Sequence, residues 1–313
     1  MPRPLSIITC AYFFLLIVNS GPQTVAPAQE RGDQQVFVRT DLVSFLVTVT
    51  DSRGKSVAGL DKSAFAVTDD KMKQEITFFT AADAPTSVGI IFDLSGSMST
   101  EGINRAREAL SKFFETSDKR DDFFLIGFRS SPQVMVDKTR DPDLIERSLA
   151  DVKPQGDTAI FDALRLGVER IAKGTHAKRA LLLISDGDEN HSRYTFNEVR
   201  RTLEESDATL YSIWVWNGTR LASKAGAPIQ NTLNGLSEVT GGKAYYPSSS
   251  AKMEEAFNQI ALELRHQYSI GYRPTNFTND GRWHRLEVKV SPSTADSRLS
   301  VRTRKGYYAL LKR

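Results

Sequence analysis

The chain has 313 residues, of which 40% are hydrophobic and 25% are charged, and its formal net charge is +3. These values are ordinary for a globular protein and allow one large domain or two smaller ones. The small net charge gives no electrostatic reason to expect a nucleic-acid partner or attraction to a membrane surface.

The first 28 residues have the pattern of a signal peptide. Arg3 precedes an apolar run from Leu5 to Val18, and Ala26-Pro27-Ala28 fits a small-x-small cleavage site. We therefore expect residues 1–28 to be removed and the product to be exported, to the periplasm or the cell exterior. The run is short for a spanning helix, and no later stretch approaches the length needed to span a bilayer, so we expect no stable membrane insertion after cleavage. An uncleaved anchor is the alternative. Cys10 is the only cysteine, so the mature chain would lack thiol chemistry.

Two β-rich regions flank the centre of the chain. In residues 29–84, Val43, Phe45, Val47 and Val49 alternate with other side chains, and a hairpin is expected around Asp69-Asp70-Lys71. Residues 267–313 contain similar alternations, for example at Leu286, Val288 and Val290. We predict that the N-terminal and C-terminal strands pair into a small β-sandwich.

Residues 85–266 have a different pattern, in which short apolar runs alternate with helical periodicity. Continuous apolar runs suit strands that are buried on both faces of a parallel sheet. The pattern predicts an α/β domain with a doubly wound, mostly parallel sheet and helices on both faces. The apolar runs are 88–92, 123–128, 180–184 and 210–215, and the helical stretches are 103–114, 159–171, 196–205, 233–239 and 252–265.

Oxygen-bearing side chains follow the ends of these runs. Asp93, Ser95 and Ser97 lie directly after the first run, Thr158 precedes a helix, and Asp186 ends the third run. Ligands of such folds bind at the carboxyl edge of the sheet, where these loops would converge. Hydroxyl and carboxylate oxygens suit a hard divalent cation, most simply Mg²⁺, with Mn²⁺ or Ca²⁺ as alternatives.

The series Asp-x-Ser-x-Ser, Gly-x-Thr and Ser-Asp-Gly resembles the metal-ion-dependent adhesion site of von Willebrand factor A (VWFA) domains. The β-rich flanks, with Tyr268 to Tyr272 and Lys305 to Tyr308, resemble an exported, acidobacterial-type group of VWFA-related proteins. The resemblance implies that Ser95, Ser97 and Thr158 are direct ligands and that Asp93 and Asp186 act largely through water. It also implies a protein partner that presents Glu or Asp to the open metal position, and no catalysis.

Three other interpretations stay open. The ion could serve a metal-dependent hydrolase, for which Asp157 and His191 are the nearby candidate bases. The chain could be a structural part of an envelope assembly, with the sandwich as its main contact surface. The site could also be empty, or could only brace its loops.

Several nearby or isolated polar residues are expected to be structural. Asp188 and Glu189 are predicted to form a solvated loop rim, and Asp162 to stabilise the N-terminus of its helix. The four histidines show no metal-ligand spacing, so the sequence predicts no zinc site.

Overall fold

The computed structural model describes residues 42–80, 83–216, 226–275, 280–291 and 299–309. The predicted signal peptide, residues 1–28, lies outside the described residues. The domain boundaries proposed from the sequence stay predictions.

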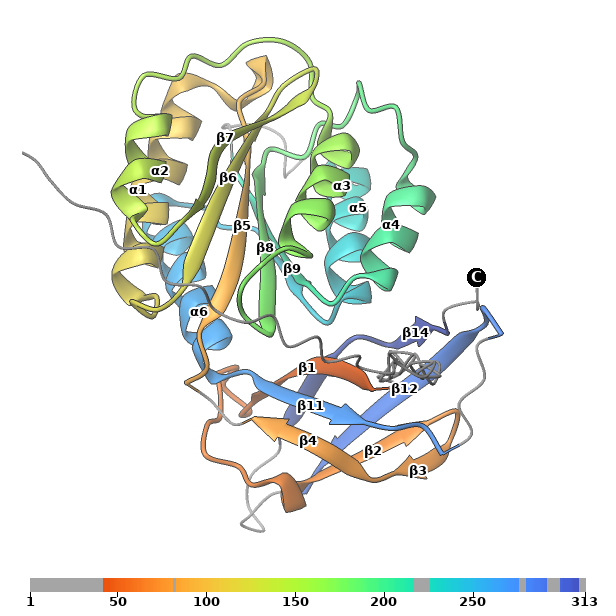
Figure 1. Ribbon diagram of the computed structural model, residues 1–313. Helices are drawn as coiled ribbons and strands as arrows, with labels where there is room; N and C mark the ends of the chain where they lie inside the picture. Colours follow the sequence, from red (N-terminus) through yellow and green to blue (C-terminus); the bar gives the residue numbers. More distant parts are fainter. Residues whose placement is uncertain (1–41, 81–82, 217–225, 276–279, 292–298, 310–313) are drawn as a thin grey trace, which may run out of the picture. The chain divides into compact units, whose positions relative to one another are not determined.

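A six-stranded sheet forms the centre of the α/β part (Figure 1). All neighbouring strands run parallel except β6 and β7, which are antiparallel. The predicted mostly parallel sheet is therefore confirmed. Across the sheet the order is β10 (Lys243–Tyr245), β9 (Thr209–Trp214), β8 (Lys178–Ser185), β5 (Thr86–Asp93), β6 (Asp122–Phe128) and β7 (Pro132–Thr139).

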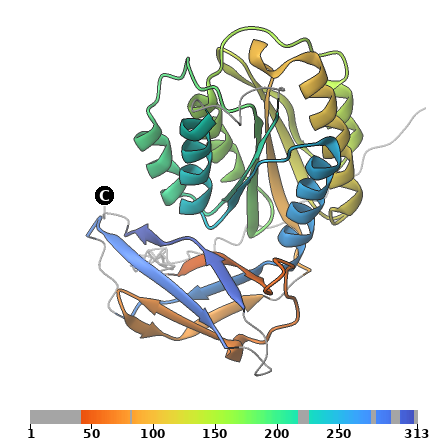
Figure 2. The same cartoon turned by 180° about the vertical axis from the view of Figure 1, so that it is seen from behind.

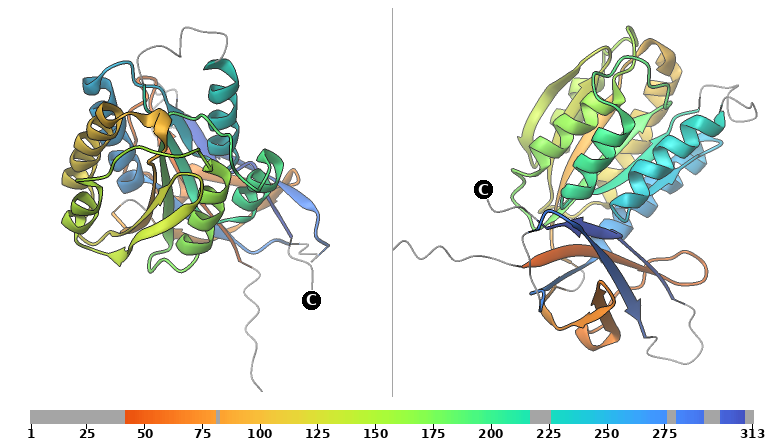
Figure 3. Two further views of the ribbon diagram at one scale, coloured as in Figure 1. Left: turned by 90° about the horizontal axis from the view of Figure 1, so that it is seen from above. Right: turned by 90° about the vertical axis from the view of Figure 1, so that its right-hand side faces the viewer.

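Helices cover both faces of this sheet, in keeping with the complete burial of its central strand β5 (Figure 3). On one face lie α1 (Thr100–Thr116), α2 (Pro142–Leu149) and α6 (Ser250–His266), which share one hydrophobic cluster. On the other lie α3 (Ile160–Ile171), α4 (Phe196–Glu205) and α5 (Gly226–Val239), which share a second. None of the helices in the described part of the chain is both long and apolar enough to cross a bilayer.

Two strands and one α-helix of the α/β part were not predicted from the sequence. Strand β7 is one of the two edge strands, and its residues are mostly half-buried. Its pairing with β6 is irregular, and its side chains do not form an apolar run. Helix α2 has only 8 residues, beginning with Pro142 after the capping residue Asp141, and β10 has only 3 residues. Such short elements give weak periodic signals.

The remaining strands form two four-stranded antiparallel sheets. Their apolar faces share one hydrophobic core, so the predicted sandwich of N-terminal and C-terminal strands is confirmed. One sheet has the order β13 (Ser300–Thr303), β1 (Val43–Thr50), β11 (Tyr268–Tyr272) and β4 (Ile76–Thr80). The other has the order β14 (Gly306–Tyr308), β12 (Trp283–Val290), β2 (Phe65–Asp69) and β3 (Met72–Gln74). A short 3₁₀ helix, η1 (Lys62–Ala64), precedes β2.

The α/β part passes into the sandwich at a buried polar cluster, where α6 leads directly to β11 (Figure 2). Gln267, between the two elements, donates through Nε2 to Thr48 Oγ1 of β1 (3.2 Å) and to the Tyr211 hydroxyl of β9 (2.9 Å). The Tyr211 hydroxyl in turn donates to Glu263 Oε1 of α6 (2.9 Å). Hydrogen bonds therefore connect both parts at this point.

Candidate metal centre

The three loops that carry the predicted ligands meet at the carboxyl edge of β5 and β8. Backbone hydrogen bonds hold the first two together, because Gly96 N donates to Gly156 O and Gln155 N donates to Leu94 O, both at 3.0 Å. Gly156 has a φ of +77°, a conformation that favours glycine. The third loop is attached through Asn190, whose backbone N–H donates to Thr158 O (3.1 Å).

Asp93 ends β5 as a buried carboxylate. Its Oδ1 accepts from Ser95 N (2.9 Å), and its Oδ2 accepts from Ser185 Oγ (2.5 Å). Both donors are neutral, and no cationic side chain of the described residues is paired with this carboxylate. Burial raises the pKa of Asp93 to about 6, with a smaller contribution from the nearby carboxylate of Asp186.

The three hydroxyl residues lie on the first two of these loops, and Ser95 is in direct contact with Asp93. Ser95 and Thr158 are buried and Ser97 is half-buried, and the two serine oxygens lie 3.1 Å apart. Ser97 is the middle residue of η2 (Gly96–Met98), the 3₁₀ turn that leads into α1. The Thr158 amide donates to Asn190 Oδ1 (3.0 Å), which sets the backbone at the threonine.

Asp186 follows β8 and is also buried. The indole Nε1 of Trp214 donates to its carbonyl (2.8 Å), and Asp188 N lies 3.4 Å from its Oδ1. The buried Trp214 side chain thus holds the Asp186 loop. Gly187, the next residue, has a φ of +79°, and a Cβ there would lie 2.2 Å from Ile229 Cγ2. Glycine is therefore required where the chain leaves the site.

Comparison with known proteins identifies the part of the chain that carries these loops. The von Willebrand factor type A domain family matches residues 88–189. A von Willebrand factor type A structure from Catenulispora acidiphila superposes with a TM-score of 0.51 at 12% identity, covering 87% of this chain and 74% of that one. The chain contains a von Willebrand factor type A domain.

Two curated relatives match the same domain over part of their length. The uncharacterized protein sll0103 of Synechocystis is 24% identical over 110 residues, which are 34% of this chain and 26% of that protein. Human inter-alpha-trypsin inhibitor heavy chain H4 is 25% identical over 142 residues, 42% of this chain and 15% of that protein. The chain thus spans about a quarter or less of the length of these relatives.

The donor set of this von Willebrand factor A domain fits a hard cation. Three hydroxyl oxygens and two buried carboxylates offer oxygen ligands alone, which is the environment that Mg²⁺ and Ca²⁺ prefer. Two buried carboxylates close together are costly unless a positive charge compensates them. The residues present are therefore suited to a divalent cation.

Other residues support the site from positions that the sequence did not indicate. Glu189 was predicted to be solvated, which is wrong. Its Oε2 accepts from Ile160 N (2.6 Å), Phe161 N and Ser192 Oγ, and its Oε1 accepts from His191 N and Ser192 N. It thereby caps α3, whose own N-cap residue, Ala159, supplies no side-chain hydrogen bond. The bonds to Ile160 and Phe161 join residues 28 or 29 positions apart, so no local pattern marks them.

Asp162, in the first turn of α3, does more than stabilise the helix end as predicted. It is buried and accepts from Arg193 N and Arg193 Nε, both at 2.9 Å. Together with Glu189, it ties the segment after Asp186 to the helix that follows Thr158. The loops of the von Willebrand factor A domain are thus fixed by carboxylates outside the ligand set.

A pocket of about 500 Å³ adjoins the Gly156 loop. Its wall combines side chains from the end of β6, the edge strand β7 and the loops around Leu94 and Gln155. Arg129, Gln133 and Met135 supply a guanidinium, an amide and a thioether to this wall. The wall of this pocket is therefore mixed polar and apolar surface.

Proposed function

We propose that this chain binds a divalent cation, most simply Mg²⁺, through Ser95, Ser97, Thr158, Asp93 and Asp186, and uses it to bind an acidic group on a protein partner. The hydroxyls would be direct ligands, and the two aspartates would act largely through bound water. Von Willebrand factor A domains are protein-interaction modules. The proposal adds a bound cation and an acidic group on the partner to that general role.

The observation that carries the proposal is the buried Asp93 carboxylate, which is held by neutral donors alone beside a second buried carboxylate. Neutral hydroxyl ligands would leave a bound cation attractive to a further anionic ligand. An incoming Glu or Asp side chain supplies that ligand. The pocket beside Gly156 is available for residues that flank the acidic side chain.

The cation site is tested by calorimetric titration of Mg²⁺ and Mn²⁺ into wild type, Asp93→Asn and Asp121→Asn. Asp121 is a matched control, because it is also buried and accepts backbone amides from Thr86 and Asp118, but it precedes β6, at the opposite end of that strand. We expect Asp93→Asn to weaken cation binding at least about tenfold and Asp121→Asn to retain it. Wild-type affinity in a folded Asp93→Asn variant would contradict the assignment.

Partner binding is tested with the same proteins immobilised and exposed to cell extract, with Mg²⁺ or with chelator. A partner that binds through the cation is captured only with Mg²⁺ and not by Asp93→Asn. Capture that persists in chelator would instead favour the structural role in an envelope assembly.

The hydrolase alternative depends on Asp157 and His191. Their side chains lie 3.5 Å apart (Asp157 Oδ2 to His191 Nδ1), and both are more than half exposed. Because a solvated, mutually paired acid and base offers little activation of a nucleophile, we propose binding and not catalysis. Metal-dependent turnover of ester substrates that is lost in Asp157→Asn would overturn this choice.

A further inference from the structure

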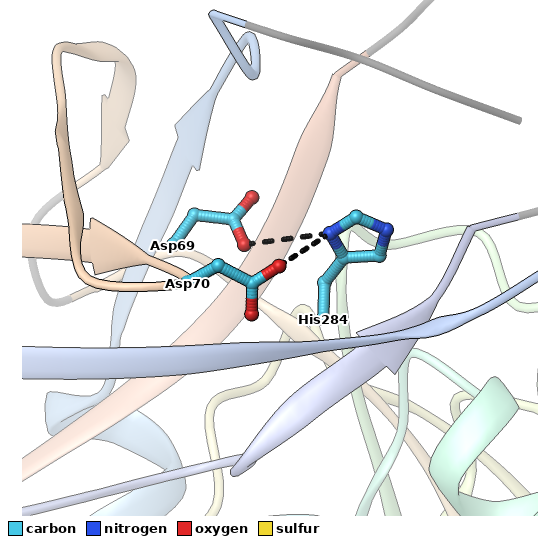
Figure 4. Close-up of side chains that lie close together, drawn as sticks. All are labelled: Asp69, Asp70 and His284. Carbon is cyan, nitrogen blue, oxygen red and sulfur yellow. Dashed lines mark ion pairs between the residues drawn. The ribbon is translucent and has the colours of Figure 1, made fainter. Parts of the chain in front are cut away.

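We infer a second cation site in the sandwich, formed by Asp69, Asp70 and His284 (Figure 4). Asp69 ends β2, Asp70 begins the turn to β3, and His284 lies on the neighbouring strand β12. One ligand atom from each residue lies within 4.8 Å of the other two. His284 Nδ1 is 3.0 Å from Asp70 Oδ2 and 3.9 Å from Asp69 Oδ1.

The buried carboxylate of Asp69 points to a ligand at this place. Its Oδ2 accepts hydrogen bonds from the hydroxyls of Tyr272 and Tyr307, both at 2.8 Å. Its Oδ1 is buried and has no hydrogen-bond partner within the described ranges, although it faces His284 and Asp70. A buried carboxylate oxygen left unsatisfied is costly. A cation between the three side chains would remove that cost.

The other atoms of the three side chains are held as ligands of a metal usually are. Asp70 Oδ1 accepts from Arg285 N (2.9 Å), while Asp70 N donates to Arg285 O (2.9 Å), which leaves Oδ2 directed to the cluster. The imidazole of His284 stacks on the ring of Tyr307, with centroids 5.3 Å apart, and its Nε2 lies 3.6 Å from Asp280 Oδ1. This separation is too long for a hydrogen bond, so Asp280 contributes a nearby negative charge behind the histidine and does not fix its ring.

The donor set selects a different class of ion from the first site. An imidazole nitrogen with two carboxylate oxygens suits Zn²⁺ and other divalent transition metals, whereas Mg²⁺ and Ca²⁺ prefer oxygen alone. The side chain of Asp70 is 53% exposed, so water can reach the cluster and complete the coordination. We therefore expect one Zn²⁺ to bind in the sandwich, independently of the adhesion-type site.

The spacing of the histidines along the chain gives no sign of this site. His284 and the aspartates are separated by the whole α/β part of the chain, and only the pairing of β2 with β12 brings them together. A spacing rule cannot detect ligands that are assembled by strand pairing between the two ends of a chain.

The test is calorimetric titration of Zn²⁺ into tag-free full chain and into Asp70→Asn and His284→Ala variants. Asp70→Asn is the conservative choice, because Asp70 lies in the left-handed region (φ 47°), which asparagine tolerates. His191→Ala is the matched control, since His191 is also near an aspartate but lies outside the sandwich. Asp93→Asn separates this site from the first one.

We expect wild type, His191→Ala and Asp93→Asn to bind one Zn²⁺ equally, and Asp70→Asn and His284→Ala to bind it at least about tenfold more weakly. Zn²⁺ should also raise the Tm of wild type and not that of Asp70→Asn. Equal affinity in all five proteins, or no Zn²⁺ binding by folded wild type, would overturn the inference. Loss of binding in Asp93→Asn alone would place the ion at the first site instead.

Discussion

Lys178, the first residue of β8, is a buried ammonium group, only 1% exposed. Its Nζ donates to Leu264 O near the end of α6, a long contact of 3.5 Å. Burial lowers the pKa of Lys178 to about 8, and the carboxylate of Asp121 offsets only part of this effect. The charged form is therefore less stable in the folded protein than in water.

We predict that Lys178→Met changes how stability depends on pH. The pKa of Lys178 is about 8 in the folded protein, whereas an unperturbed lysine, as in the unfolded chain, has a pKa of 10.5. Between pH 8 and pH 10.5 the unfolded chain therefore binds more protons at this residue than the folded protein does. The free energy of unfolding of wild type should therefore rise relative to Lys178→Met as the pH increases from 8 to 10.5, by up to about 3 kcal/mol. Urea denaturation of both proteins across this range measures the difference. Parallel pH profiles would contradict the prediction.

Residues with a strong local context were predictable from the sequence, and residues paired over long distances were not. Asp93 was found because a carboxylate directly follows an apolar run. Glu189 was missed because its partners, such as Ile160 N, are 29 positions away. The same holds for Asp69, whose tyrosine partners come from β11 and β14.

At the scale of elements, the start of α3 depends on a side chain from another loop. Glu189 supplies the acceptor that the N-cap residue lacks. Thr158, one of the predicted ligands, lies just before this helix end. The helix terminus and the cation site should therefore respond together when the cap is removed.

We predict that Glu189→Ala lowers the free energy of unfolding by about 1–2 kcal/mol, as loss of a helix cap does, and also weakens Mg²⁺ binding. Glu198→Ala is the matched control, because Glu198 completes a capping box with Thr195 at the start of α4. The control should lose similar stability but keep its cation affinity. Denaturation and calorimetry on both variants decide the matter, and an unaffected cation affinity in Glu189→Ala would refute the coupling.

The central elements of the fold were predictable because their physical signals are strong. Strands β5 and β8 are fully or almost fully buried, so nearly all their side chains are apolar or at an end of the strand. Strand β7 is partly exposed and irregularly paired, and it therefore lacks a regular alternation. The sandwich was predictable from alternation alone, but the partners within each sheet were not, because alternation carries no information about which strands pair.

At the scale of the molecule, Arg302 and Glu263 join the sandwich to the α/β part. Arg302 lies on β13 and forms an ion pair with Glu263 of α6, and its Nε donates to Gly241 O (3.0 Å). The Glu263 side chain is only 6% exposed, whereas that of Arg302 is 29% exposed. The pair completes the polar cluster around Tyr211 and Gln267.

We predict that Arg302→Met lowers the free energy of unfolding by about 2–4 kcal/mol, because it leaves the Glu263 carboxylate buried without a cation. Since Arg302 is partly exposed, we expect a value toward the lower end of this range. Adding Glu263→Gln should recover part of the loss, since the charge is then absent. Urea denaturation of wild type and of the single and double variants gives the coupling free energy between Arg302 and Glu263. Simple additivity of the two single effects would show that the pair contributes nothing.

The strand pairing of the sandwich also imposes an order on synthesis. Val47 of β1 pairs with Tyr268 of β11 and with Thr303 of β13. This strand, the first among the described residues, therefore waits for partners that are made more than two hundred residues later. The intervening domain can fold during that delay, because its strands pair among themselves. Until translation passes β13, the edges of β1 are open to other chains, and protection of the nascent chain by a chaperone matters most in this interval.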